Sequence, residues 1–233
     1  GADGVLYVYV DDGTTDNLAV SSDNGKTWSY TEVDGEIFAI AASPTDPDVV
    51  YISIEDQVYK SSDGGSSFSM MASTPDEEYI TAMDVAMVDG SYKVVVGAVE
   101  TIGTPSTFES QVFFMDEADF FYSFEPIGTP SFNDTHPGSV IFDVKLSPDF
   151  ANDKGIVVLA EDDLSPLTPF VSFNVNGGAW GGTIAPESIG SGNADWGSIA
   201  LPDDFNVLTS PLFYVSVWGD SGNDGVWRIL GDS

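Results

Sequence analysis

The sequence predicts an all-β fold, a β-propeller built from four-stranded antiparallel blades. Three observations lead to this prediction. Short β-branched and aromatic runs alternate with turns rich in Gly, Pro and Asp. A turn motif, Ser-x-Asp-x-Gly-x-Thr/Ser-aromatic, occupies 21–28 and returns at 61–68. About four short strands fall within each period of roughly 40–45 residues, which is the spacing of a propeller blade.

The motif describes a hairpin turn that anchors itself. Its Asp can accept a hydrogen bond from its own backbone two residues on, its Gly can take a positive φ, and its aromatic residue enters the next strand. Two weaker copies follow, in which Ala118 replaces the Gly of one and Asn176 replaces the Asp of the other. The motif residues are Ser21, Asp23, Gly25, Thr27, Trp28, Ser61, Asp63, Gly65, Ser67, Phe68, Asp116, Phe121, Asn176 and Trp180.

The chain divides into five successive units within one domain, 1–233. Their approximate ranges are 1–34, 35–74, 75–129, 130–187 and 188–233. The expected strands per unit are three, four, four, four and three, because the first unit lacks an opening strand and the fifth a closing one. We therefore expect about five blades, as an arc of a larger propeller. Sixteen of these strands have defined bounds, at 5–10, 18–20, 28–31, 37–42, 49–54, 57–60, 68–71, 80–87, 92–99, 111–114, 140–146, 155–160, 169–173, 197–201, 212–218 and 226–229.

The repeated motif resembles the Asp-box, or bacterial neuraminidase repeat, of a β-propeller superfamily that includes sialidases, sortilin-like receptors, some endoglucanases and photosystem assembly factors. The resemblance implies a structural motif on the hairpin between the third and fourth strands of a blade. It implies that the two Asp residues cap their turns and that Trp28 and Phe68 pack between neighbouring blades. A sialidase holds its substrate carboxylate with three arginines. Arg228 is the one arginine here, so the resemblance does not extend to that activity.

The charge balance excludes several partners. Six Lys and Arg residues face 38 Asp and Glu residues, and the formal net charge is −32. Such a field repels nucleic acids and anionic membranes. It also favours bound divalent cations or high salt, although a merely solvated acidic surface explains it equally well. Cysteine is absent, which excludes disulfides and thiolate chemistry, and no apolar run reaches the roughly 20 residues of a membrane helix.

Calcium is the one cofactor that the sequence suggests, because four acidic loops offer hard oxygen donors. None has the EF-hand spacing, and a solvated turn is the alternative for each. The candidate ligands are Asp11, Asp12, Asp16, Asp149, Asn152, Asp153, Glu161, Asp162, Asp163, Asp220, Asn223 and Asp224.

Other sites are weaker. The single His136 lacks a second His or Cys for a zinc or catalytic site. No carboxylate pair stands out as glycosidase machinery, so no catalytic residue is predicted. Asn133 begins a glycosylation sequon. The tryptophans Trp196, Trp218 and Trp227 are expected in the core between blades.

Together these features favour a non-catalytic, extracellular or cell-surface module from a secreted prokaryotic protein. It would bind other protein chains or further copies of itself, as in a surface layer or filament, and its open blade edges offer strands for pairing. The alternative is a carbohydrate-active or glycan-binding propeller. Converging carboxylates and an aromatic platform at the ring centre would favour that alternative.

Overall fold

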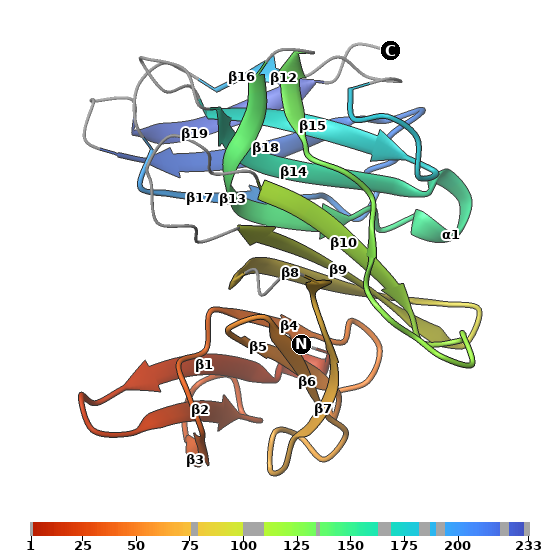
Figure 1. Cartoon of the computed structure of the whole chain (residues 1–233). Coiled ribbons are helices and arrows are strands. Elements are labelled where there is room, and N and C mark those ends of the chain that lie inside the picture. Colours follow the sequence, from red (N-terminus) through yellow and green to blue (C-terminus); the bar gives the residue numbers. More distant parts are fainter. Residues whose placement is uncertain are drawn as a thin grey trace.

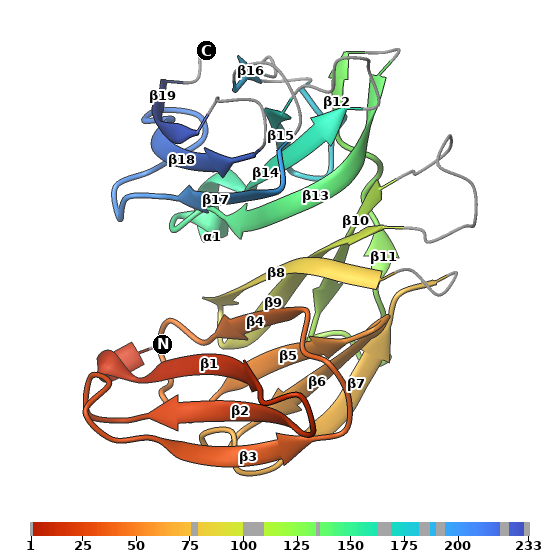
Figure 2. The same cartoon turned by 90° about the vertical axis from the view of Figure 1, so that its left-hand side faces the viewer.

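The computed structural model describes residues 2–75, 79–99, 110–133, 136–162, 169–181, 187–189, 194–219 and 224–230. They form five antiparallel sheets that follow one another along the chain (Figure 1). Figure 2 shows the first sheet at the bottom of the view and the fifth at the top. Among these residues the helical elements are one 3-10 turn, η1 (Ala2–Gly4), and one short helix, α1 (Phe150–Asp153).

The first two sheets differ by one strand. In pairing order the first contains β1 (Leu6–Asp11), β2 (Asp16–Ser21) and β3 (Ser29–Val33). The second contains β4 (Ala39–Ala42), β5 (Val50–Ile54), β6 (Gln57–Ser61) and β7 (Ser69–Ser73).

The third and fourth sheets contain the longest strands. The third contains β8 (Tyr79–Val88), β9 (Ser91–Val99), β10 (Ser110–Asp116) and β11 (Glu125–Pro126). The fourth contains β12 (Ser131–Asn133), β13 (His136–Leu146), β14 (Gly155–Asp162), β15 (Pro169–Val175) and β16 (Glu187–Ser188). The fifth contains β17 (Trp196–Ala200), β18 (Leu212–Trp218) and β19 (Gly225–Leu230).

Each expected unit holds one sheet, and the strand numbers differ from expectation in the fourth. That sheet has five strands because β12 folds back onto the start of β13, with Ser131 opposite Pro137. The outer strands β11 and β16 are two residues each. Strands so short carry no periodicity that a sequence pattern could reveal.

Four hydrophobic clusters hold the sheets together, and each joins two consecutive sheets. Strands in the middle of the stack are therefore apolar on both faces, as in β14, where every residue is buried. The clusters centre on Leu18 with Val50 and Ile52, on Tyr51 with Val94 and Phe113, on Val95 with Ile141 and Val158, and on Leu159 with Phe173 and Phe213.

Two glycines permit the close approach of neighbouring sheets. A Cβ at Gly97 would lie 2.5 Å from Cγ2 of Ile141, and one at Gly197 would lie 2.3 Å from Cδ2 of Leu159. Both distances are far below van der Waals contact, so a larger residue at either position would push two sheets apart.

One strand from each of the second to fifth sheets lies next to its counterpart in the neighbouring sheet, in the order β4, β8, β13 and β17. They form the inner side of the stack. None of the helical segments among the described residues is long and apolar enough to cross a membrane.

Candidate functional site

The two full turn motifs fold as self-anchored hairpins. The backbone N–H groups of Lys26 and Thr27 donate to Oδ1 of Asp23 (2.9 and 2.8 Å), and the Thr27 hydroxyl donates to Oδ2 (2.7 Å). Ser67 donates to Asp63 in the same way, through its N–H (2.9 Å) and hydroxyl (2.6 Å). The carboxylates therefore reach three and four residues along the chain, farther than the two expected.

The serine and glycine of each motif complete the turn. The hydroxyl oxygen of Ser21 accepts a hydrogen bond from the N–H of Gly25 (2.8 Å), and Ser61 accepts one from Gly65 (2.9 Å). Gly25 and Gly65 have φ of 82° and 85°, which a residue with a Cβ adopts at a cost. These hydrogen bonds are internal to each hairpin, so the motif is a structural element.

The two motif aromatics behave differently. Phe68 packs against the cluster between the first and second sheets, in line with the expectation. Trp28 does not: it is 36 % exposed, and its Nε1 donates to the carbonyl of Gly25 in its own turn (3.2 Å). Trp28 belongs to the first sheet of the stack, and among the described residues no preceding sheet is present for it to pack against.

In the first weakened motif the aspartate still anchors the turn, but the aromatic residue is not packed between sheets. Asp116 accepts hydrogen bonds from the N–H of Ala118 (2.8 Å) and the Ser91 hydroxyl (3.0 Å). Phe121 is 86 % exposed and its neighbour Phe120 is 90 % exposed, so the aromatic residue of this copy does not pack between sheets as Phe68 does.

In the second weakened motif a different asparagine holds the turn. Asn174 accepts from the N–H of Gly177 (3.1 Å) and donates to the carbonyl of Gly178 (2.5 Å). Asn176 instead supplies a left-handed residue, with φ of 55°. Trp180 does bridge sheets, because its Nε1 donates to the carbonyl of Ile127 (3.1 Å). Asn174 occupies the position of the motif serine. Because this copy is one residue shorter before Trp180, Asn174 makes the hydrogen bonds that the motif Asp makes in the full copies.

The acidic loops use their carboxylates within the protein. Asp12 accepts from the N–H groups of Thr14 and Thr15 (2.9 Å each), and the hydrogen bond from the Thr14 hydroxyl does most to lower the pKa of Asp12, to about 2. Asp11 accepts from the N–H of Gly13 (2.6 Å), and Asp16 from the Tyr9 hydroxyl.

The second predicted calcium loop is likewise occupied by internal hydrogen bonds. Asp153 is buried, and its oxygens accept from the Ser147 hydroxyl (2.6 Å), the N–H of Val207 (2.9 Å) and the N–H of Gly155 (2.9 Å). Asp149 accepts from the side-chain amide of Asn152 (2.5 Å). This loop connects β13 to β14, and its hydrogen bond from Val207 links the fourth sheet to the segment between β17 and β18 of the fifth.

The remaining predicted ligands do not gather. Glu161 and Asp162 end β14, whereas Asp224 accepts from the N–H of Gly219 (2.9 Å) between β18 and β19. In the described ranges no three His, Cys, Asp or Glu side chains are placed to hold a metal ion together. Asp163, Asp220 and Asn223 lie outside those ranges. Asn133 ends β12, and the other two positions of its sequon, 134 and 135, also lie outside.

The inner side of the stack contains a cleft of about 560 Å³, which is the candidate functional site. It is lined by Tyr9 from β1, residues 36–40, Thr81 from β8 and Trp196 from β17. Glu36 is the carboxylate in this lining, and Phe38 packs edge to face on Tyr79 at a centroid distance of 5.6 Å. A cleft of this size with aromatic walls suits a peptide strand or a carbohydrate chain.

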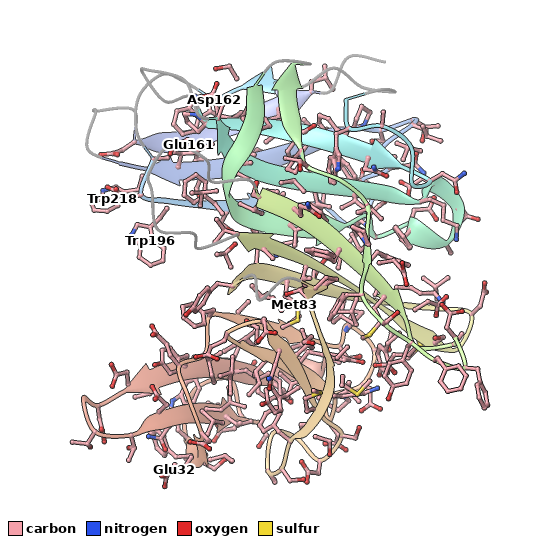
Figure 3. The ribbon with its side chains drawn as sticks, viewed as in Figure 1. Glu32, Met83, Glu161, Asp162, Trp196 and Trp218 are labelled. Carbon is pink, nitrogen blue, oxygen red and sulfur yellow. The ribbon has the colours of Figure 1, made fainter. Side chains whose placement is uncertain are left out.

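Two exposed tryptophans lie side by side on the fifth sheet, and one of them, Trp196, lines the cleft. Trp196 and Trp218 are direct cross-strand partners on β17 and β18, and they are 71 % and 55 % exposed. Figure 3 shows both side chains projecting from the edge of the fifth sheet. The expectation that they fill the core is therefore wrong. Trp227, in contrast, is partly buried against the hydrophobic cluster between the fourth and fifth sheets. Alternation along the strand puts them on the outward face, and no sheet among the described residues covers that face.

The first sheet has a free edge beside this cleft. In the second sheet the turn motif joins β6 to β7, the third and fourth strands, whereas in the first sheet it joins β2 to β3, the second and third. The first sheet thus has no strand that corresponds to β4, the inner strand of the second sheet. Among the described residues no strand pairs with the edge of β1 that faces away from β2, and Tyr9 of β1 lines the cleft.

Two carboxylates on the inner strands, half-buried Asp84 and buried Asp143, join consecutive sheets. Asp84 of β8 accepts from the N–H of Leu146 at the end of β13 (2.8 Å). Asp143 of β13 accepts from the N–H of Ile199 of β17 (2.7 Å) and pairs with Lys145 (2.9 Å). Burial raises the pKa of Asp84 to about 6. No sequence pattern predicts these contacts, because an Asp inside an apolar run has no distinguishing spacing.

Among the described carboxylates, Glu161 also has a raised pKa, and its burial is the main cause, with the charges of Asp162 and Asp195 adding to it. Its Oε1 accepts from the N–H of Ala194 (2.7 Å), which fixes the segment that leads to Trp196. Figure 3 shows Glu161 and Asp162 close together on β14. A raised pKa makes Asp84 and Glu161 the first candidates for acid catalysis. Both accept hydrogen bonds from backbone N–H groups, and neither lines the cleft.

Comparison with solved structures supports a β-propeller fold. A GH74 xyloglucanase from Xanthomonas campestris superposes with a TM-score of 0.56 at 16 % identity, covering 97 % of this chain and 34 % of that one. An ancestral GH74 enzyme gives 0.50 at 12 %, with 97 % and 35 % covered. BBS1N, solved in complex with ARL6DN, gives 0.54 at 14 %, with 97 % and 62 % covered. The chain thus spans about a third of the length of the GH74 enzymes. No protein family model and no curated protein matches the chain.

Proposed function

We propose that this chain is a non-catalytic interaction module of the β-propeller type, and that a β-strand from a second copy of the chain completes its first sheet. The observation that carries the proposal is the free edge of β1 beside the central cleft. An exposed strand edge is a template for pairing with another chain, and the backbone hydrogen bonds supply the affinity. Successive copies joined in this way would form a filament or surface layer.

Two further features support this proposal over catalysis. The outward faces of the terminal sheets are apolar, with Leu6 and Val8 exposed on the first sheet and Tyr214 and Trp218 on the fifth. The raised-pKa carboxylates Asp84 and Glu161 are bonded to backbone N–H groups away from the cleft. A glycosidase needs two carboxyl groups facing one substrate, and Glu36 alone among the described carboxylates lines this cleft.

The setting that we propose is extracellular or at the cell surface of a prokaryote, with Ca²⁺ bound at some of the acidic loops. The net charge of −32 and the absence of cysteine support it. A specific calcium site would raise the melting temperature more than sodium does at equal ionic strength. Equal shifts in the two salts would contradict it.

The test of strand addition is Val8→Lys on β1. Val8 is 44 % exposed, so a lysine is accommodated, and lysine on an edge strand opposes pairing with another strand. Sedimentation velocity over a concentration series should show self-association of the wild type in physiological salt, weakened at least tenfold in Val8→Lys. Tyr30→Lys on β3, at the opposite edge of the same sheet and 63 % exposed, is the matched control. A wild type that stays monomeric throughout the series would refute the proposal.

Carbohydrate binding is a second candidate function, favoured by the exposed pair Trp196 and Trp218, of which Trp196 lines the cleft. Tryptophan faces stack on sugar rings, and one of the similar structures is a xyloglucanase. Trp196→Ala should abolish retardation of the protein in a gel that contains xyloglucan. Trp28→Ala, which removes an exposed tryptophan far along the chain, should leave it unchanged. Equal migration of the wild type with and without the polysaccharide would count against this candidate.

A further inference from the structure

A pocket of about 310 Å³ lies between the third and fourth sheets, on the side of the turns and away from the central cleft. Its walls come from β10, from helix α1 with the residue that follows it, and from the hairpin after β15. Two lysines, Lys93 and Lys154, line this pocket. The whole chain has six Lys and Arg residues against 38 acidic ones, so two cations in one small pocket are a marked local reversal of charge.

The first lysine is neutralised within the protein. Lys93 lies 2.5 Å from Oδ1 of Asp116, which also lines the pocket. Burial alone would raise the pKa of Asp116, but the bonds from Lys93, the Ala118 N–H and the Ser91 hydroxyl outweigh it, and the pKa lies below its usual range. Asp116 therefore stays ionised, and this pair contributes no net charge.

The second lysine keeps its charge unmatched. Lys60, Lys93 and Lys145 each form an ion pair, but no carboxylate in the described part of the chain lies within ion-pair distance of Lys154. Its Nζ lies 5.5 Å from the centroid of the Phe150 ring, over the ring face. A half-buried ammonium without a carboxylate partner is unusual in so acidic a chain, because long-range attraction favours pairing. The pocket thus has a net charge of about +1.

The rest of the lining is mostly apolar. Phe114 and Phe150 pack against each other at a centroid distance of 5.8 Å, and Ile127 and Ile156 extend this surface. Asn176 adds an exposed side-chain amide, whereas the amide of Asn174 is used by its own turn. The volume is at the lower end of the range of small-molecule sites, about 300–1,000 Å³.

We propose that this pocket binds a small monocarboxylate whose body is apolar and about the size of one aromatic ring. The carboxylate pairs with the ammonium of Lys154, and the body lies on the surface formed by Phe114 and Phe150. A polyanion is excluded, because the net charge of −32 repels every charge beyond the one that the pocket neutralises. This site is independent of strand addition and of carbohydrate binding at the central cleft.

The proposed ligand needs both a carboxylate and an apolar ring, and three probes test these two requirements separately. Phenylacetate has the carboxylate and the ring, acetate has the carboxylate alone, and 2-phenylethanol has the ring alone. Titration followed by amide NMR shifts should show phenylacetate binding at least tenfold more tightly than either of the other two. The shifts should centre on Gly155 and Gly177, which flank the pocket. Equal binding of phenylacetate and 2-phenylethanol would overturn the proposal, because the ammonium would then have no part.

Lys154→Gln should weaken phenylacetate binding at least tenfold and leave 2-phenylethanol unchanged. Lys26→Gln makes the same change of charge at an exposed lysine on the first sheet, and binding should be unaffected. Should Lys154→Gln fold poorly, Asn176→Asp provides a second test, since aspartate also tolerates the left-handed backbone and places a negative charge at the pocket. Undiminished phenylacetate binding in a folded Lys154→Gln or Asn176→Asp variant would refute the site.

Discussion

The interior sheets and the terminal sheets differ in how they use the two faces of a strand. In β14 of the fourth sheet every residue is buried, whereas in β18 of the fifth sheet buried and exposed residues alternate. The exposed set on β18 is not the polar set of a solvated face, because it includes Tyr214 and Trp218. The outward face of a terminal sheet thus has the composition of an internal interface, and this is the property that a partner chain would use.

The sharpest test of this comparison places two substitutions side by side on β18. Phe213→Ala removes a fully buried ring that packs edge to face on Phe173 and Phe205, and it should lower the free energy of unfolding by about 3–5 kcal/mol. Tyr214→Ala, at a 41 % exposed ring on the opposite face, should cost less than about 1 kcal/mol in the monomer. Urea denaturation measures both. A loss at Tyr214 as large as that at Phe213 would mean that its face is already covered.

The second prediction concerns the interior side of the comparison, through Asp84. Its pKa is raised from 3.8 to about 6, so the stability that it contributes is present below pH 4 and is lost as the pH rises through 6. Its ionisation in the folded protein costs on the order of 3 kcal/mol at pH 7.5. Asp84→Asn should therefore be more stable than the wild type at pH 7.5, and the advantage should disappear by pH 4. Urea denaturation at both pH values in high salt checks this, and a pH-independent difference would contradict it.

The smallest effect is expected at an exposed turn of the second sheet. The hydrogen bonds from Ser67 hold the pKa of Asp63 at about 2, so its contribution to stability is present above pH 4 and is lost between pH 4 and pH 2. Asp63→Ala should lower the melting temperature by less than Phe213→Ala does, and the difference from the wild type should narrow as the pH falls from 4 to 2. Asp119→Ala, in the weakened turn of the third sheet, should change nothing, because the neighbouring Asp116 anchors that turn. A larger loss at Asp119 would reverse the assignment of anchors.

The sequence predicts most of the strand order because local rules decide it. The turn at Asp63 contains its donors and acceptor within five residues, and β-branched runs between such turns specify the strands. It fails where a tertiary neighbour decides. Phe213 and Trp218 are both aromatic residues of one strand, but Phe213 faces the fourth sheet and Trp218 faces outward. The sequence pattern does not show which face of the strand another sheet covers.

The candidate site could not be predicted from the sequence, because it too depends on which segments become neighbours in the fold. The cleft joins Tyr9, Thr81 and Trp196 from three sheets, with no common motif among them. Asn174 was missed in favour of Asn176 because the turn is one residue shorter than the motif, and a shift of one residue moves the anchoring side chain to the neighbouring position. Lys154 had a compositional signal, since cations are so rare here, but its isolation from carboxylates is a property of the fold.

The inner-strand aspartates give the stack a direction of assembly. Asp84 finds its N–H donor on the fourth sheet and Asp143 finds one on the fifth, so each carboxylate is satisfied by a segment made later in synthesis. Until that segment docks, the carboxylate must stay hydrated or protonated, and the preceding sheet cannot close. We expect the third, fourth and fifth sheets to gain protection from hydrogen exchange together, as one cooperative unit, with the first two sheets opening independently of it.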